Sequence, residues 1–340
     1  MPQRVGGSEA STHDLAMALR ARGHRIAVFA SLDRTGLTWL RNRGLARLYN
    51  ARFPADQWLP YRIYRGHMKH ELERGLTEVA AEFKPDLIIV QAGQPMELAR
   101  ISIGLGLRTL VYLRDTQFEE LGGPLIRKDG LNYVANSTFT ASAYRRAFGI
   151  EVPVIPPLVC ATSYRTRTRG RYVLFVNPVG VKGVNIAVAV ARRLRHIPFV
   201  FLQSWPLWES ASRELRKQLL PLANVRLQPQ VGNMRPVYSG TRLLMVPSQW
   251  EETWGRVVTE AQFSGIPSVA SNVGGLPESV GPGGILVDQY HCAEPWCDVI
   301  QELWHNPGAL RSLNEAALAH SQREAIQPET LCRQLLAALP

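Results

Sequence analysis

The sequence predicts an α/β protein of two domains, the second of which is built on a parallel β-sheet. Its 340 residues are enough for two domains of ordinary size. Between residues 171 and 287, short apolar segments alternate with helical patterns, and this alternation is typical of a parallel sheet covered on both faces. We expect an N-terminal domain over residues 1–160, a polar, basic linker over 161–170, a C-terminal domain over 171–320 and a final helical segment over 321–340.

The composition is that of an ordinary globular protein, with 46% hydrophobic and 20% charged residues. No run of about eighteen apolar residues occurs, so no transmembrane helix is expected. No signal-peptide pattern opens the chain, and we therefore expect a cytoplasmic location. The four cysteines are scattered and match no metal-ligand spacing, which suits a reducing compartment and predicts no metal site.

The formal net charge of +11 is the strongest compositional signal for partners. A solvated surface without a special role is one interpretation. Peripheral contact with the anionic inner face of a membrane, or with an anionic lipid-linked acceptor, is the second. Nucleic-acid binding is the least favoured, because no nucleic-acid module is recognised. The basic residues that prompt these interpretations are Arg20, Arg22, Arg41, Arg43, Arg47, Arg52, Arg62, Arg65 and Lys69.

The first domain opens with a double glycine, Gly6-Gly7, which permits a tight turn beside a phosphate or a sugar. A helical pattern follows and stops at Gly23. We then predict a strand over 25–30, an irregular arginine- and aromatic-rich region over 36–66, a helix over 67–83, and strands over 87–90 and 109–113. Arg114 directly follows the last of these strands. A strand near 133–137 and a helix that ends at Phe148 complete the domain.

The second domain places its notable residues after successive strands. We predict strands over 171–176, 198–203, 224–227, 242–246, 267–271 and 284–287, and helices over 184–194, 292–305, 308–320 and 328–339. Ligands of parallel sheets bind beyond the carboxyl ends of the strands. The loops that leave those ends are 177–183, with Asn177 and Lys182, then 203–205, then 229–232, with Val231, and then 248–252.

Two glutamates, Glu252 and Glu260, stand in the segment that follows the fourth strand, with seven residues between them. The apolar pattern predicts a helix that begins near Gly255 and ends at Gly265. The backbone N–H groups at Gly255 and Arg256 would then face an anion such as a diphosphate. A carboxylate before the helix is suited to sugar hydroxyls, and one deeper on the helix to a ribose diol.

The same segment resembles a known enzyme family. Its pattern, S-x-x-x-E-x-x-G-x-x-x-x-E-A-x-x-x-G-x-P-x-x-A-S-x-x-G-G-x-P-E, is similar to the E-x7-E signature of retaining glycosyltransferases of family 4, which have the GT-B fold. The resemblance covers most of the chain and is strongest from Asn177 to Asp288. It implies two Rossmann-like domains with parallel sheets that face a cleft, and a last helix that returns to the first domain.

The resemblance also implies residue roles. Glu252 and Lys182 would be catalytic, and no metal or cofactor would be needed, because positive charge on the protein would stabilise the departing diphosphate. Val231 would hold the nucleobase through backbone atoms. The donor-binding residues that the resemblance implies are Gly6, Gly7, Asn177, Val231, Thr253, Trp254, Gly255, Arg256 and Glu260.

Three departures from the family pattern stand out. Asn177 occupies a position where arginine is usual, and Arg114 a position where histidine is common, so Arg114 is either an acceptor-side residue or the partner of Asp115. An apolar strand normally precedes the first glycine loop, and we expect the N-terminal sheet to lack it. The implied function is transfer of a hexose from a nucleoside diphosphate sugar to a saccharide or lipid-linked acceptor. A degenerate, non-catalytic GT-B protein is the alternative, and sugar-nucleotide epimerisation is a weaker one.

Overall fold

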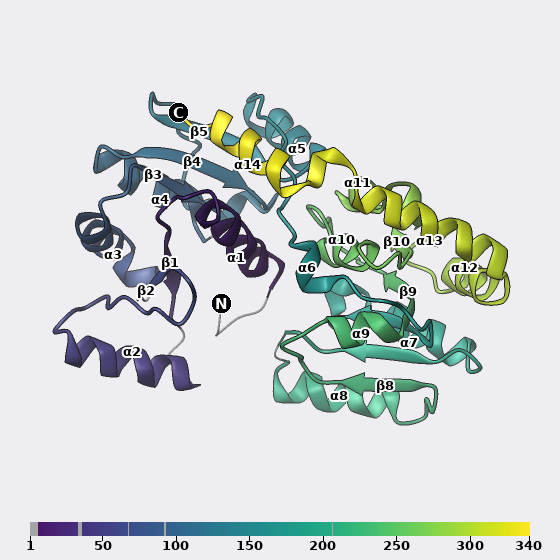
Figure 1. Ribbon diagram of the computed structural model, residues 1–340. Helices are drawn as coiled ribbons and strands as arrows, with labels where there is room; N and C mark the ends of the chain where they lie inside the picture. The colour runs from purple at the N-terminus through teal and green to yellow at the C-terminus, as the bar shows by residue number, and fades with distance from the viewer. Residues whose placement is uncertain (1–5, 33–35, 67, 92, 206) are drawn as a thin grey trace. The chain divides into compact units, whose positions relative to one another are not determined.

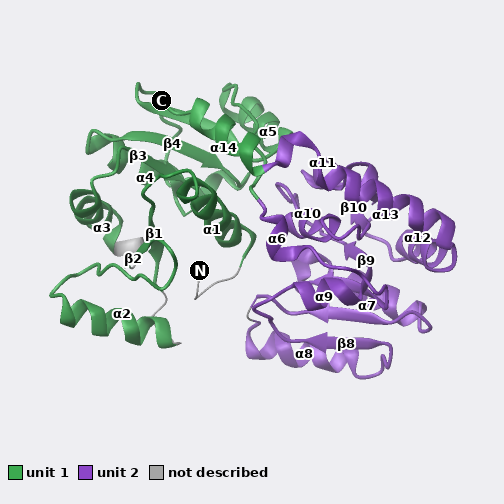
Figure 2. Cartoon of the chain, viewed as in Figure 1, with its two compact units in different colours: residues 1–158, 328–340 green, residues 159–327 purple. Residues whose placement is uncertain are grey.

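The computed structural model describes residues 6–32, 36–66, 68–91, 93–205 and 207–340, and the chain forms two compact units (Figures 1 and 2). Unit 1 comprises residues 1–158 and 328–340, and unit 2 comprises residues 159–327. Residues 161–170, which we predicted to be a linker, lie in unit 2 and begin with the short helix α6 (Ala161–Tyr164). Among the described residues, no helix is both long enough and apolar enough to cross a membrane.

Unit 2 contains one six-stranded parallel sheet with the order β11-β10-β9-β6-β7-β8. All six strands that we predicted for this domain are confirmed to within one residue at each end. They are β6 (Tyr172–Val176), β7 (Phe199–Leu202), β8 (Val225–Gln228), β9 (Thr241–Val246), β10 (Ser268–Ser271) and β11 (Gly284–Val287).

Helices cover both faces of this sheet, as the alternation predicted. Val173 and Phe175 of β6 pack into one apolar core with α7 and α12, whereas Leu174 faces a second core with α10. Successive residues of a strand point to opposite faces, so one strand supplies both cores. The helices of unit 2 after α6 are α7 (Val184–Arg193), α8 (Glu209–Leu219), α9 (Arg235–Gly240), α10 (Arg256–Gln262), α11 (Leu276–Val280), α12 (Glu294–His305) and α13 (Pro307–Ser321), with 3₁₀ turns η2 (Gly180–Lys182), η3 (Gly281–Gly283) and η4 (Glu324–Ile326).

Unit 1 has five strands in two separate parallel sheets within its described residues. The first pairs β1 (Ala27–Ser31) with β2 (Arg62–Gly66), and the second joins β3 (Leu87–Val90), β4 (Arg108–Leu113) and β5 (Leu131–Ala135). The helices are α1 (Gly7–Arg20), α2 (Gly36–Leu48), α3 (Met68–Phe83), α4 (Pro95–Gly104), α5 (Thr138–Phe148) and α14 (Pro328–Ala337), with the 3₁₀ turn η1 (Phe118–Glu120). Our prediction that residues 36–66 are irregular is wrong at both ends, where α2 and β2 lie.

The two sheets of unit 1 leave a cavity between them. It has a volume of about 1230 Å³, and its walls include every residue of β1 and of β3, together with residues of α1 and α3. Most of these wall residues are apolar, for example Leu15, Leu72 and Leu76. Within the described residues, β1 and β3 are not paired with each other.

The last helix, α14, belongs to unit 1 although α13 belongs to unit 2. Its buried Leu331 and Leu335 join a core with Leu15 and Leu19 of α1 and with Tyr112 of β4. The chain therefore leaves unit 1 after residue 158 and re-enters it at residue 328. This is the course that the family resemblance implied for the final helix.

Candidate active site

The candidate site of unit 2 lies where the strand order of its sheet reverses. β6 is followed on one side by β7 and β8, and on the other side by β9, β10 and β11. A crevice forms at such a switch point, because the loops that leave the two adjacent strands turn in opposite directions. These loops are 177–183, after β6, and 247–255, after β9.

Two predicted catalytic residues meet at this point. The Lys182 ammonium lies 2.5 Å from Oε1 of Glu252, and the side chains are only 14% and 13% exposed. The Ser248 hydroxyl donates a second hydrogen bond, 2.7 Å long, to the same carboxylate oxygen. A cation and a carboxylate from positions 70 residues apart in the sequence are thus held together at the carboxyl ends of the strands.

Tryptophan rings flank the Lys182 ammonium. Nζ lies 5.2 Å from the ring centroid of Trp205 and 4.8 Å from that of Trp250. Both distances are within the range of a cation–π interaction, which stabilises a cation without neutralising it. Position 182 is therefore built to hold a positive charge in a partly buried place.

Asn177 holds the loop that carries one of these rings. Its Oδ1 accepts hydrogen bonds from the backbone N–H groups of Ser204 and Trp205, at 3.0 and 2.9 Å. Its own backbone is left-handed, with φ 61°, a conformation that asparagine adopts more readily than most residues. The Asn177 side-chain oxygen, predicted to contact the donor, thus serves to position Trp205.

Close backbone contacts fix the two loops against each other. Gly183 has φ 80°, and a Cβ atom there would lie 1.8 Å from the carbonyl oxygen of Pro247. Gly274, after β10, has φ 62°, and a Cβ atom there would lie 2.3 Å from the carbonyl oxygen of Glu252. The backbone N–H of Gln249 also donates to the carbonyl of Val181, at 2.9 Å. Side chains at either glycine would push the loops apart, and Lys182 with them.

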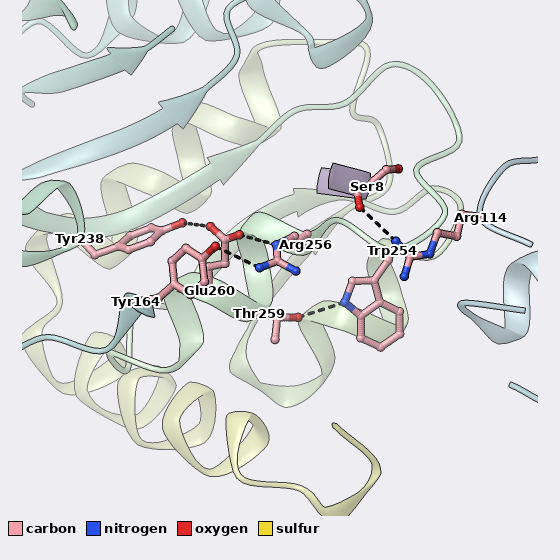
Figure 3. Close-up of polar contacts among 8 residues, drawn as sticks. All are labelled: Ser8, Arg114, Tyr164, Tyr238, Trp254, Arg256, Thr259 and Glu260. Atoms are coloured by element: carbon pink, nitrogen blue, oxygen red, sulfur yellow. Dashed lines mark hydrogen bonds and ion pairs between the residues drawn. The ribbon is translucent and has the colours of Figure 1, made fainter. Parts of the chain in front are cut away.

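Glu260 lies in a buried polar network that connects α10 with α9 (Figure 3). One carboxylate oxygen is 2.8 Å from Nε of Arg256, and the other accepts a 2.8 Å hydrogen bond from Tyr238. Arg256 also donates to the Tyr164 hydroxyl, at 3.0 Å. Burial, and then the negative charge of Glu260, raise the pKa of Tyr238 well above its ordinary value, so its hydroxyl remains a donor. The sequence patterns did not indicate Tyr238 or Tyr164 in this role.

The surroundings of α10 differ from our expectation in two respects. The helix has only seven residues, so its dipole is small, and the Arg256 guanidinium is turned to Glu260 within the unit. The Trp254 side chain is 5% exposed and donates through Nε1 to the Thr259 hydroxyl. Trp254 and Gly255 can thus offer backbone groups, rather than side chains, to a ligand. Thr253 lies beside Gly275, where an added Cβ atom would be 2.4 Å from the Thr253 carbonyl oxygen.

Val231 lies in the loop after β8 and packs, partly buried, against the core that contains Tyr238. Its loop leads into α9, which carries Tyr238, and therefore into the Glu260 network. Sequence reasoning singled out this loop and those at 203–205 and 248–252, but it gave no role to Trp205, Ser248 or Trp250. Their positions directly after strands were the available signal.

The remaining candidates are in unit 1. Gly6 is the N-cap of α1, Gly7 is its first residue, and the next carbonyl, that of Ser8, accepts a 3.4 Å hydrogen bond from Arg114 (Figure 3). The Arg114 guanidinium also lies 4.2 Å from the ring centroid of Tyr112. The structure therefore brings Arg114 to the first turn of α1. Asp115, its sequence neighbour, accepts from the backbone N–H of Gln117.

No group of three or more histidine, cysteine, aspartate or glutamate side chains in the described part of the chain is arranged to hold a metal ion. The site chemistry that the residues themselves offer is a cation at Lys182, two carboxylates and several backbone N–H groups. These groups suit an anionic, hydroxyl-rich ligand.

Two family models match this chain. The model described as "Glycosyl transferase 4-like domain" matches residues 6–153, and the model "Glycosyl transferases group 1" matches residues 170–306. The chain is also similar to two curated proteins named "D-inositol 3-phosphate glycosyltransferase". The protein from Corynebacterium aurimucosum is 40% identical over 89 residues, which are 26% of this chain and 21% of that protein. The protein from Pseudarthrobacter chlorophenolicus is 27% identical over 231 residues, which are 60% of this chain and 54% of that protein. The matched regions thus span from about a fifth to about half of these relatives.

A solved structure from Anabaena, Alr3699/HepE in complex with UDP-glucose, has a similar fold. Its TM-score is 0.76 at 18% sequence identity, with 98% of this chain and 96% of that one covered. This likeness shows the fold, and the two family models together cover both units of this chain. The chain belongs to the group 1 glycosyltransferases and has the two Rossmann-like α/β units of the GT-B fold.

Proposed function

We propose that this protein is a retaining glycosyltransferase that moves a hexose from a nucleoside diphosphate sugar to a hydroxyl of a saccharide or lipid-linked acceptor, in cell-surface polysaccharide or glycoconjugate synthesis. The observation that carries the proposal is the contact between Lys182 and Glu252 at the switch point of the unit 2 sheet. Binding of UDP-glucose by the Anabaena protein of similar fold supports the choice of donor class.

Lys182 stabilises the leaving group in this mechanism. Its ammonium lies beside two indole rings, which hold a cation without neutralising its charge. Neutralisation comes instead from Glu252, as long as no donor is bound. A diphosphate brings a stronger negative charge to the same place, so the ammonium shifts from the carboxylate to the phosphate oxygens as charge develops on them.

Glu252, once released, accepts hydrogen bonds from hydroxyls of the hexose and orients the anomeric carbon. The Ser248 hydroxyl keeps one of its oxygens in position. Glu260 accepts from the ribose hydroxyls and remains anchored by Arg256 and Tyr238. The anchors prevent rotation of the carboxylate, which lowers the entropic cost of binding the nucleoside.

The transfer itself breaks the bond between the anomeric carbon and the diphosphate oxygen and forms a bond to the acceptor oxygen on the same face of the sugar. The proton of the acceptor hydroxyl passes to the departing phosphate, so no further base is needed. We propose that this reaction needs no metal ion, since Lys182 supplies a positive charge. Activity that is unchanged by EDTA, and not raised by added Mg²⁺ or Mn²⁺, is the expected result.

Calorimetric titration with UDP, GDP and ADP tests the donor site. One nucleotide should bind clearly more tightly than the other two, and the Glu260→Ala variant should bind it at least about tenfold more weakly, because removal of a charged hydrogen-bond acceptor costs about 1.5–3 kcal/mol. No binding of any nucleotide by the folded protein would favour the alternative, a non-catalytic relative. The divided sheet of unit 1 and the structural use of Asn177 are the observations on its side.

Transfer from the preferred donor tests the catalytic assignment. Glu252→Ala should reduce turnover by about a thousandfold, in the range seen when one group that stabilises a transition state is removed. Glu251→Ala is the matched control, because Glu251 is the adjacent carboxylate in the chain but is exposed to solvent. Equal activity of the two variants would contradict the role of Glu252.

The peripheral partner of this enzyme, in our proposal, is the anionic cytoplasmic face of a membrane, where a lipid-linked acceptor is presented. The net charge of +11 supports this. Sedimentation with anionic vesicles, compared with neutral ones, tests the association.

A further inference from the structure

Helix α2 of unit 1 carries three of its leucines on the outside, while Trp39 and Leu45 are half-buried. Leu37, Leu40 and Leu48 are 78%, 58% and 73% exposed, whereas the polar Thr38 and Asn42 are buried. A helix that packs on a core does the opposite, because burial of leucine is favourable and burial of a polar group has a cost. Nδ2 of Asn42 is in fact buried without a hydrogen-bond partner among the described residues. The outward leucines are therefore a feature that the fold of unit 1 does not use.

The exposed leucines form one stripe. Leu37, Leu40 and Leu48 are spaced by three and eight residues, so they project from the same side of a helix with 3.6 residues per turn. On the same helical spacing, Arg41 flanks the stripe on one side, and Arg43 and Arg47 flank it on the other. All three arginines are exposed. Figure 2 shows α2 at the edge of unit 1, apart from the three-stranded sheet.

Two aromatic residues extend this apolar stripe. Tyr49, which follows α2 directly, is 65% exposed, and Trp58 is 54% exposed. The guanidinium of Arg41 lies 4.7 Å from the Trp58 ring, so Trp58 is adjacent to the helix. We call the exposed side chains of Leu37, Leu40, Arg41, Arg43, Arg47, Leu48, Tyr49 and Trp58 the α2 surface.

The exposed charge of the α2 surface is basic. Residues 36–55 contain four arginines and no acidic residue. Asp56, which lies 3.7 Å from the Arg41 guanidinium, is only 3% exposed, and Arg52 is paired with Glu71, so Arg43 and Arg47 complete the positive charge that α2 itself presents. A second copy of the same surface would therefore bring like charges together, which disfavours self-association. A nucleic acid would engage the arginines but would leave the leucines in water. An anionic bilayer engages both, because its headgroups attract the arginines and its outer acyl region accepts leucine, tyrosine and tryptophan side chains.

We propose that the α2 surface is the membrane-docking element of this protein, and that α2 lies in the plane of an anionic phospholipid bilayer with its leucine stripe in the interface. This deepens the membrane part of the proposed function by naming the element. It does not depend on the donor site, because α2 belongs to unit 1 and the Lys182–Glu252 pair belongs to unit 2.

The test is flotation of the full chain with vesicles of phosphatidylcholine alone or with about 30% phosphatidylglycerol, a charge density at which basic residues near the surface are attracted. We expect binding only to the anionic vesicles. The triple variant Leu37→Ser/Leu40→Ser/Leu48→Ser should bind them at least about tenfold more weakly, and the variant Arg41→Gln/Arg43→Gln/Arg47→Gln about a hundredfold more weakly, since each basic residue near an anionic surface contributes about 1 kcal/mol.

Matched controls separate this surface from general charge and hydrophobicity. Arg145→Gln/Arg146→Gln/Arg216→Gln removes three exposed arginines elsewhere, and Leu220→Ser removes a leucine that is 87% exposed in unit 2. Both should bind like the wild type. Failure of the wild type to bind anionic vesicles would overturn the proposal, as would equal losses in the arginine variant and its control. The proposal would also be overturned if the wild type formed a dimer without lipid and the leucine variant were monomeric. The partner of the α2 surface would then be a second copy of this chain.

Nucleotide titration of the same variants keeps the two proposals distinct. The leucine variant should bind the preferred nucleotide as the wild type does, and its circular dichroism should be unchanged because the substituted side chains are exposed. Lost vesicle binding with intact nucleotide binding supports the α2 surface. Intact vesicle binding with no nucleotide binding leaves the α2 surface standing and contradicts the donor site.

Discussion

We predict that the two members of the Lys182–Glu252 pair contribute unequally to the stability of unit 2. Activity measurements alone would miss this difference. We expect Lys182→Met to destabilise unit 2 clearly more than Glu252→Gln does, although both substitutions remove the same ion pair. The reason is the difference in the contacts that the remaining residue keeps after its partner is substituted. Without Glu252, the ammonium still lies between Trp205 and Trp250. Without Lys182, the carboxylate keeps the hydrogen bond from the Ser248 hydroxyl but loses the cation that neutralises it.

The expected magnitudes follow from burial. Both side chains are less than 15% exposed, at 14% and 13%. Loss of one partner from a buried pair costs about 3–5 kcal/mol, and the remaining solvent exposure and the Ser248 hydrogen bond bring this to about 3 kcal/mol for Lys182→Met. For Glu252→Gln, the two cation–π contacts and the retained amide reduce the loss to about 1 kcal/mol. The difference of about 2 kcal/mol is roughly a thirtyfold change in the unfolding equilibrium.

Urea unfolding of the full chain, followed by tryptophan fluorescence and far-ultraviolet circular dichroism, measures these losses. The double variant Lys182→Met/Glu252→Gln should be more stable than the sum of the single losses predicts, because no uncompensated charge remains in it. Losses that agree within about 0.5 kcal/mol, or a larger loss for Glu252→Gln, would refute the argument that the indole rings hold the cation.

Three further predictions rest on other parts of the chain. Gly183→Ala should cost about 2–4 kcal/mol in urea unfolding, from its left-handed backbone and the contact with Pro247, while Gly180→Ala, where a Cβ atom meets nothing within 4 Å, should be nearly neutral. A segment of five valine and isoleucine residues placed directly before Gly6 should raise the stability of unit 1 by about 2 kcal/mol by filling the cavity between β1 and β3, and a serine and threonine segment of equal length should not. Burial, and then the positive charge of Arg323, lower the pKa of His320 from 6.5, so the folded state favours the neutral imidazole. The stability that depends on this group is complete above pH 6.5 and is lost as the pH falls, so His320→Gln should reduce the slope of the unfolding free energy between about pH 7 and 5 in urea unfolding at each pH.

The fold of unit 2 was predictable because its strands are short apolar segments between turn residues. Each of its six strands follows that rule, and each predicted boundary lies within one residue of the structure. Helix α2 was not predictable by the same rule. Three of its leucines are exposed, its buried residues are Thr38 and Asn42, and Trp39 and Leu45 are only half-buried, so the sequence shows no clear apolar face directed at a core. A segment with outward apolar residues gives a misleading signal about its own packing.

The loops of the candidate site could be selected from the sequence, but their contacts could not. The rule that ligands bind beyond the carboxyl ends of parallel strands is enough to select the loops that contain Lys182, Glu252 and Trp205 from the sequence alone. It does not reveal that Lys182 and Glu252 touch, or that Arg256 is turned inward to Glu260. Such contacts depend on approach between loops distant in sequence, as in the packing of Gly183 against Pro247, and no local pattern encodes that approach.

Asn177 shows why a residue's role does not follow from its position alone. An arginine at this position would add a cation beside the proposed diphosphate, so asparagine first suggests a weakened site. The structure gives the asparagine a different task, because its left-handed backbone and two hydrogen bonds hold Ser204 and Trp205, and Trp205 in turn flanks the Lys182 ammonium. An arginine has no acceptor for those two N–H groups and tolerates φ 61° less well. In the proposed mechanism, the positive charge for the leaving group therefore depends on Lys182, and Asn177 contributes by positioning Trp205 beside that lysine.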